Sequence, residues 1–267
     1  MSYFEAIILA IVQGITEFLP VSSSAHLILV PELLGWQDQG LAFDVAVHIG
    51  TLIAVLAFLR KELQAIIPAW LIGWKGFDWN ASGKLGWLIV IATIPVGLVG
   101  FFAGGLIEIY LRSSMVIAMS TLVFGLLLGW ADGSGDENQR PMEELTWKQT
   151  CLVGIAQAFA LIPGTSRSGV TMTAMLAMGF NRVAAARFSF LMAVPAIALP
   201  GLLKCCELIV GGKAVAWDVL FVGVIVSALT AFACMHWFMR FIQRVGMKPF
   251  VIYRILLAIL IVFLVKS

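Results

Sequence analysis

Apolar stretches of membrane-spanning length dominate the chain. A helix needs about 20 consecutive apolar residues to cross the hydrocarbon core of a bilayer. Six stretches approach this length and contain few ionisable side chains. They are predicted to be transmembrane helices at roughly residues 41–59, 85–106, 114–131, 184–203, 214–239 and 249–265.

Two other regions consist of short apolar runs interrupted by polar residues. The runs 4–19 and 27–34 flank the string Pro-Val-Ser-Ser-Ser-Ala-His, and the runs 151–162 and 170–180 flank the string Pro-Gly-Thr-Ser-Arg-Ser-Gly. Irregular backbone is tolerated at membrane depth only where protein or water satisfies its polar groups. Each region is therefore predicted to form a re-entrant helix–loop–helix hairpin.

The two halves of the chain resemble each other in the order of their motifs. Gly14-Ile-Thr-Glu-Phe followed by Pro20-Val-Ser-Ser-Ser24 parallels Gly154-Ile-Ala-Gln-Ala followed by Pro163-Gly-Thr-Ser-Arg-Ser168. This order predicts a duplication within one membrane domain: residues 1–131 and 147–267 are the repeats, and residues 132–146 are the linker. Each repeat holds one re-entrant pair and three spans. An odd number of spans inverts the second repeat, so the two polar strings are expected to meet near the midplane.

Composition supports an all-α polytopic membrane protein. The chain is 61% hydrophobic and 12% charged, a balance that excludes a soluble domain. Its net charge of +2 gives no reason to expect nucleic acid as a partner. The positive-inside rule assigns to the cytoplasm the side richer in Lys and Arg, which leaves both termini outside. That side carries Arg60, Lys61, Lys75, Lys84, Arg140, Lys148, Arg182, Arg240, Arg244 and Lys248.

The first polar string carries candidate catalytic groups. Gln13 and Glu17 are four residues apart and share one face of a helix. Beyond Pro20, three serines supply hydroxyls at the start of the next helix, and His26 follows Ser23 by three residues. A glutamate and a histidine at membrane depth are costly unless they line a functional site.

The second polar string offers complementary, anion-binding chemistry. Pro163 and Gly164 form a turn, and Ser166 is placed to N-cap a helix that runs through Thr171. Free backbone N–H groups at a helix start favour an anion. Arg167 adds a planar, permanently charged group suited to phosphate oxygens.

These motifs resemble those of the bacterial undecaprenyl-diphosphate phosphatase (bacitracin resistance protein) family. The segment Gln13-Gly-Ile-Thr-Glu-Phe-Leu-Pro-Val-Ser-Ser-Ser-Ala-His26 is similar to its first signature, and Pro163-Gly-Thr-Ser-Arg-Ser-Gly-Val-Thr171 is similar to its second. The resemblance implies hydrolysis of a polyprenyl diphosphate lipid to the monophosphate on the outer side of the inner membrane. That step recycles the carrier lipid of peptidoglycan synthesis and confers bacitracin resistance.

The resemblance also implies a divalent cation, Mg²⁺ or Ca²⁺, and essential roles for Glu17, Ser23, His26 and Arg167. Some members carry Glu where this chain has Gln13, so a metal site with two carboxylates is in doubt, although an amide oxygen can still coordinate. We expect Glu17 and Gln13 to hold the metal. The residues expected around the phosphates are Gln13, Ser22, Ser24, Gly164, Thr165, Ser166, Ser168 and Thr171.

Our mechanistic hypothesis is that Ser23 attacks phosphorus while His26 handles the proton, with direct water attack as the alternative. Structural interpretations stand beside it: Arg167 and Glu17 could pair simply to hold the repeats together, and Asp44 and His48 are assigned to packing or pairing.

A flippase or secondary transporter is the alternative function, because inverted repeats with broken helices are typical of carriers. A phosphatidic-acid-type phosphatase is set aside, since residues 168–180 contain neither the His nor the Asp that it needs. A monomer and a homodimer are both compatible with the sequence.

Overall fold

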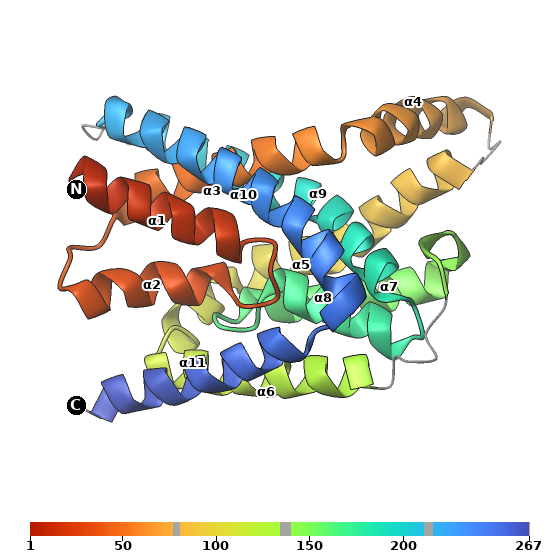
Figure 1. Cartoon of the computed structure of the whole chain (residues 1–267). Coiled ribbons are helices and arrows are strands. Elements are labelled where there is room, and N and C mark those ends of the chain that lie inside the picture. Colours follow the sequence, from red (N-terminus) through yellow and green to blue (C-terminus); the bar gives the residue numbers. More distant parts are fainter. Residues whose placement is uncertain (77–80, 134–139, 211–215, 267) are drawn as a thin grey trace.

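The computed structural model describes residues 1–76, 81–133, 140–210 and 216–266. Within these ranges the secondary structure is helical, apart from a single parallel bridge between Arg140 and Phe180. Figure 1 shows the helices packed against one another, some roughly parallel and others crossing them diagonally, with both termini at the same edge of the molecule. The all-α prediction is confirmed.

Five helices in the described part of the chain are long and apolar enough to cross a membrane. They are α3 (Gly40–Phe58), α5 (Ala81–Tyr110), α6 (Ser114–Gly133), α9 (Arg182–Val210) and α10 (Trp217–Val245). They correspond to five of the six predicted spans. The stretch predicted as the sixth span forms α11 (Lys248–Lys266), which packs along α6 at the bottom of Figure 1.

Helix α4 (Arg60–Gly76) was not expected from the sequence. Its charged beginning and its internal Pro68 are typical of a connection between spans. In the structure it packs against α5, and its Glu62 accepts a hydrogen bond of 2.6 Å from Arg187 on α9. This ion pair ties α4 to α9.

Both regions predicted to be re-entrant form pairs of short helices. The first pair is α1 (Tyr3–Thr16) and α2 (Ser23–Leu34), and the second is α7 (Trp147–Ala158) and α8 (Arg167–Ala177), with the 3₁₀ turn η2 (Phe159–Leu161) between them. At 1.5 Å per residue these helices are about 16–21 Å long, roughly half the thickness of a bilayer. Figure 1 shows the turn between α1 and α2 inside the molecule, beside α8.

Glycines let α1 and α3 pack closely on α10. A Cβ atom at Gly14 of α1 would lie 2.7 Å from the Thr230 Cβ and 2.8 Å from the Ser227 carbonyl oxygen. A Cβ atom at Gly50 of α3 would lie 2.4 Å from the Val224 carbonyl oxygen. Small residues at helix contacts are how membrane helices bring their backbones together. This packing fixes the end of α1, which carries Glu17.

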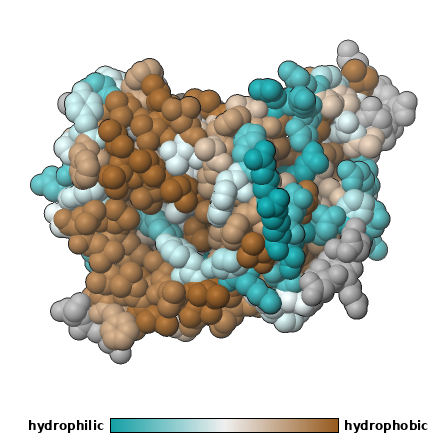
Figure 2. Space-filling model, viewed as in Figure 1, coloured by the Kyte–Doolittle hydropathy of each residue, from teal (hydrophilic) through white to brown (hydrophobic). Residues whose placement is uncertain are grey.

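The outer surface is largely apolar. Figure 2 shows brown, hydrophobic residues across much of one face, and teal, hydrophilic residues gathered mainly toward the edge away from the termini. Large side chains on α5 point outward, with Phe101 83% and Phe102 76% exposed. A surface of this kind is stable in contact with lipid and not in water.

The linker differs from the prediction at its beginning. Asp132 is part of α6, is buried, and accepts hydrogen bonds from Arg182 Nε at 2.6 Å and from the Met247 backbone N–H at 2.9 Å. It therefore joins α6 to the start of α9 and to the turn between α10 and α11, and it does not lie in a loop. Residues 134–139 of the predicted linker lie outside the described residues, and the short 3₁₀ helix η1 (Met142–Glu144) follows them.

Candidate active site

The two polar strings lie together in the interior. Arg167, the first residue of α8, donates a hydrogen bond of 3.1 Å from Nη2 to Glu17 Oε1, across 150 positions of sequence. Ser168 Oγ donates to the Leu19 carbonyl oxygen at 2.8 Å, which joins the two loops a second time. The predicted meeting of the two strings is confirmed.

Glu17 is the centre of a hydrogen-bonded cluster. Its Oε2 atom accepts bonds from Ser23 Oγ at 2.7 Å and from Gln13 Nε2 at 3.1 Å, and His48 Nε2 lies 3.7 Å away. Glu17 is 8% exposed. A buried carboxylate is stable when donors and positive charges surround it, and Arg167 supplies the permanent charge.

The two helices that follow the loops begin in the same way. Ser22, before α2, and Ser166, before α8, both have positive φ, 75° and 71°. The Ser22 and Ser24 hydroxyls are 3.2 Å apart, and those of Ser166 and Ser168 are 3.3 Å apart.

This shared geometry places Ser23 and Arg167 at the same position, the first residue of their helices. Ser166 also accepts a bond from the Gly169 backbone N–H at 3.1 Å, so its predicted capping role is confirmed. Two half-helix starts thus face one interior space, where amides without intrahelical partners favour an anion.

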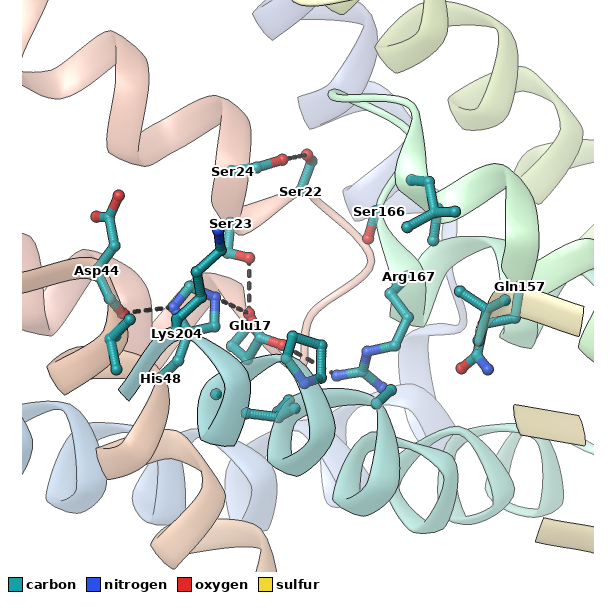
Figure 3. A pocket seen from close by; sticks show the side chains of 18 of the residues that line it. Glu17, Ser22, Ser23, Ser24, Asp44, His48, Gln157, Ser166, Arg167 and Lys204 are labelled. Atoms are coloured by element: carbon teal, nitrogen blue, oxygen red, sulfur yellow. Dashed lines mark hydrogen bonds and ion pairs between the residues drawn. The ribbon is translucent and has the colours of Figure 1, made fainter. Parts of the chain in front are cut away.

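A cavity of about 370 Å³ opens over this cluster. Figure 3 shows Ser23, Glu17 and Arg167 converging on it, with His48 and Lys204 on the same side as Glu17 and with Gln157 beyond Arg167. The walls are otherwise largely apolar. The polar residues that line the cavity are Glu17, Ser22, Ser23, Ser24, Asp44, His48, Gln157, Ser166, Arg167 and Lys204.

His26 lies on another side of α2 and does not line this cavity. Its Nδ1 is 2.7 Å from the Ser22 carbonyl oxygen, and its Nε2 is 2.5 Å from the Tyr253 hydroxyl on α11. The two rings lie nearly parallel, 9° apart. The geometry corrects our hypothesis that His26 takes the Ser23 proton, because the Ser23 hydroxyl donates to Glu17 instead.

Several residues predicted to touch the phosphates hold the loops in place instead. The Gly164 and Thr165 carbonyl oxygens accept bonds from Arg254 at 3.0 and 2.9 Å. Thr171 Oγ1 donates to Ser189 Oγ at 2.8 Å, while the Ser189 carbonyl accepts from Arg167 Nη1 at 3.1 Å. Of the predicted substrate-binding residues, those that line the cavity are Ser22, Ser24 and Ser166.

Arg254 was missed in the sequence. It lies in α11, is fully buried, and donates to backbone carbonyls from both loops and from α6. In particular, Nη1 reaches the Pro20 oxygen at 3.2 Å and the Thr165 oxygen at 2.9 Å, and Nε reaches the Thr121 oxygen at 3.0 Å. One guanidinium therefore fixes the turn after α1 to the turn before α8.

The donor set around Glu17 fits a divalent cation of the Mg²⁺ or Ca²⁺ kind. Such ions take oxygen ligands and, beside phosphates, need only one or two protein carboxylates. Glu17 supplies one carboxylate, and the Gln13 amide oxygen beside it is buried without a hydrogen-bond partner. Among the described residues, no group of three or more His, Cys, Asp or Glu side chains could hold a metal ion. A cation here would need phosphate oxygens to complete its shell.

A family model and several known proteins each match nearly the whole chain. The family model described as "Bacitracin resistance protein BacA" matches residues 6–260. "Undecaprenyl-diphosphatase 1" of Pseudoalteromonas translucida is 52% identical over 99% of both chains. "Undecaprenyl-diphosphatase" of Aliivibrio salmonicida is 52% identical over 96% of both, and "Undecaprenyl-diphosphatase 2" of Stutzerimonas stutzeri is 51% identical over 98% of both.

Proposed function

The chain belongs to the bacitracin resistance protein BacA family, and we propose that it is an undecaprenyl-diphosphatase. It is a membrane hydrolase that removes the terminal phosphate of a polyprenyl diphosphate and leaves the lipid monophosphate. The observation that carries this proposal is the contact of Ser23 and Arg167 with one carboxylate, Glu17, in a single cavity. A nucleophile, a base and a phosphate-binding cation are the parts that phosphoryl transfer needs.

The diphosphate headgroup binds where the two helix starts face each other. Arg167 uses one N–H group for Glu17 and one for the Ser189 carbonyl, and a guanidinium has five in all. The remaining donors, with the first amides of α8, are directed to the terminal phosphate. The apolar side chains along the cavity, among them Leu41, Val96 and Ile197, line the path of the prenyl chain.

In the first step, Ser23 Oγ forms a bond to the terminal phosphorus. The bond from that phosphorus to the bridging oxygen breaks, and the polyprenyl monophosphate leaves with the bonding electrons. The Ser23 proton passes to Glu17 Oε2, which lies 2.7 Å away. Water then cleaves the phosphoserine and releases phosphate. The alternative is that a water activated by Glu17 attacks the phosphorus directly. Ser23 would then only bind the phosphate.

A divalent cation fits this proposal at Glu17 and Gln13. When bound, it neutralises charge on the phosphate oxygens and orients them. Gln13 donates from Nε2 to Glu17 Oε2 at 3.1 Å, and its own amide oxygen, which has no hydrogen-bond partner, would be the second protein ligand.

The proposal extends to how the chain lies in the membrane. We propose six spans, with α11 as the sixth, and two re-entrant pairs in two inverted repeats. Five of these helices already have spanning length and composition. We place the protein in the bacterial inner membrane, with both termini and the cavity opening on the periplasmic side, in line with lipid recycling and bacitracin resistance.

Phosphate release without any gradient separates this enzyme from a carrier. We expect the purified protein in detergent to release inorganic phosphate from undecaprenyl diphosphate. Arg167→Ala should lower the rate by about 1000-fold, since arginines on a transferring phosphoryl group contribute factors of this size. Arg240→Ala, at an exposed position of α10, is the matched control. Binding of the lipid with no phosphate released would favour the flippase or transporter.

Removal of divalent cations tests the metal proposal separately. Excess chelator should lower phosphate release by at least about 100-fold, and added Mg²⁺ or Ca²⁺ should restore it. Glu17→Gln keeps the size of the side chain but removes the charge, so cations should not restore its activity. Full activity of the wild-type protein in chelator would contradict a metal at this site.

A further inference from the structure

One buried amide at the wall of the cavity has no hydrogen-bond partner for its oxygen. Gln157 on α7 is fully buried and lines the cavity, and its Oε1 atom has no hydrogen-bond partner in the structure. Its Nε2 atom donates to the Ala92 carbonyl oxygen on α5 at 3.3 Å. This bond fixes the orientation of the amide and leaves its oxygen as the atom without a partner. Figure 3 shows that oxygen on the side nearer Arg167.

A buried acceptor of this kind requires a donor. Buried polar atoms in proteins are almost always hydrogen-bonded, to protein or to water. Phosphate oxyanions are acceptors and cannot satisfy the Gln157 oxygen. A water molecule can, because it donates two hydrogen bonds.

Gln157 occupies the position in the second repeat that Glu17 occupies in the first. Gly154-Ile-Ala-Gln157 matches Gly14-Ile-Thr-Glu17, and Arg167 begins its helix as Ser23 does. Gln157 is thus the counterpart of Glu17. In Figure 3, Arg167 lies between the two. In this view a phosphate held by Arg167 would lie between Ser23 and Gln157, and in-line displacement needs the attacking and leaving oxygens on opposite sides of phosphorus.

We propose that Gln157 positions the water that hydrolyses the phosphoserine intermediate, an inference that rests on the proposed function. The water oxygen forms a bond to phosphorus opposite Ser23, and the bond from phosphorus to Ser23 Oγ breaks. Glu17 returns its proton to Ser23 Oγ, and the water keeps both of its protons, so dihydrogen phosphate leaves. Gln157 accepts a hydrogen bond from the water and exchanges no proton. It is a positioning residue.

The test is to measure the two steps separately in Gln157→Leu, which keeps the size of the side chain and removes the acceptor. Purified protein in detergent is mixed with polyprenyl diphosphate labelled in its terminal phosphate and quenched in acid. We expect Ser23 to be phosphorylated at the wild-type rate and dephosphorylated about 100-fold more slowly, the cost of a misplaced reactant. Phosphoenzyme should accumulate, and one equivalent of lipid monophosphate should appear in a burst.

Two further variants make the result decisive. Thr93→Val removes a hydroxyl on α5 next to Ala92 without touching the cavity, and it should behave as wild type. Gln157→Asn keeps the amide but withdraws its oxygen by one methylene, and it should also accumulate phosphoenzyme if Gln157→Leu does not fold. Wild-type dephosphorylation in a folded variant, or equal slowing of both steps, overturns the inference. A wild-type protein that releases no phosphate refutes the proposed function instead.

Discussion

Replacing Ser23 by alanine is expected to lower phosphate release by at least about 1000-fold and to abolish the phosphoenzyme. The hydroxyl is the group in the cavity that donates to Glu17 Oε2, at 2.7 Å. Removing a nucleophile leaves only binding and electrostatic stabilisation, which account for a minor part of the acceleration in covalent catalysis. Phosphate release and acid-stable labelling of the protein are the two measurements.

The matched control is Ser113→Ala, at an exposed serine before α6, which should retain wild-type turnover. The loss in Ser23→Ala should fall on kcat, because the Arg167 donors and the helix starts that bind phosphate remain. Substantial turnover in Ser23→Ala would eliminate the covalent route. Glu17 would then activate water directly, and the inference on Gln157 would lose its intermediate.

The long apolar stretches predicted the membrane helices because a bilayer imposes one length on every span. The polar strings were recognisable for the same reason, since serines, a histidine and an arginine stand out in apolar surroundings. Their meeting followed from the repeat, and the bond between Arg167 and Glu17 confirms it. Span length, the polar strings and the repeat all depend on the order and spacing of residues, so they can be predicted from the sequence.

Contacts across the fold were less predictable. His26 is three residues from Ser23, and this spacing indicated a shared face, but its ring bonds to Tyr253, 227 positions away. Asp44 and His48 are predicted to serve packing or pairing, and His48 does lie 3.7 Å from Glu17, but both also line the cavity because α3 passes beside the end of α1. Nothing in the local sequence of α3 indicates which of its faces the loop will meet.

Arg254 is a different kind of miss, because its signal was present. An arginine in the middle of an apolar stretch is costly in a membrane and indicates a buried partner or a functional site. It falls within residues 249–265, which are predicted to form a span. Its partners are backbone carbonyls from three separate segments. Every residue has such a carbonyl, so the sequence does not indicate which ones Arg254 binds.

Replacing Arg254 by methionine is therefore expected to destabilise the protein strongly. It should also reduce phosphate release, because the two loops that position Ser23 and Arg167 are no longer held together. Methionine fills a similar volume without a donor, so the carbonyls of Pro20 and Thr165 lose their hydrogen bonds, while that of Gly164 keeps the one from Thr121. Each buried carbonyl left unsatisfied costs about 1–3 kcal/mol, so the two together should cost roughly 2–6 kcal/mol. The melting temperature in detergent should fall by roughly 10 °C.

Arg240→Met is the control, since that arginine is exposed, and its melting temperature should stay close to wild type. Arg254→Lys should recover little, because a single ammonium cannot reproduce a planar group that reaches carbonyls on two loops and on α6. In both Arg254 variants the fall in turnover should accompany the fall in melting temperature, because Ser23 and Arg167 follow the turns that Arg254 holds. An Arg254→Met protein with wild-type stability and turnover would show that packing of α11 on α6 suffices to fix the two loops.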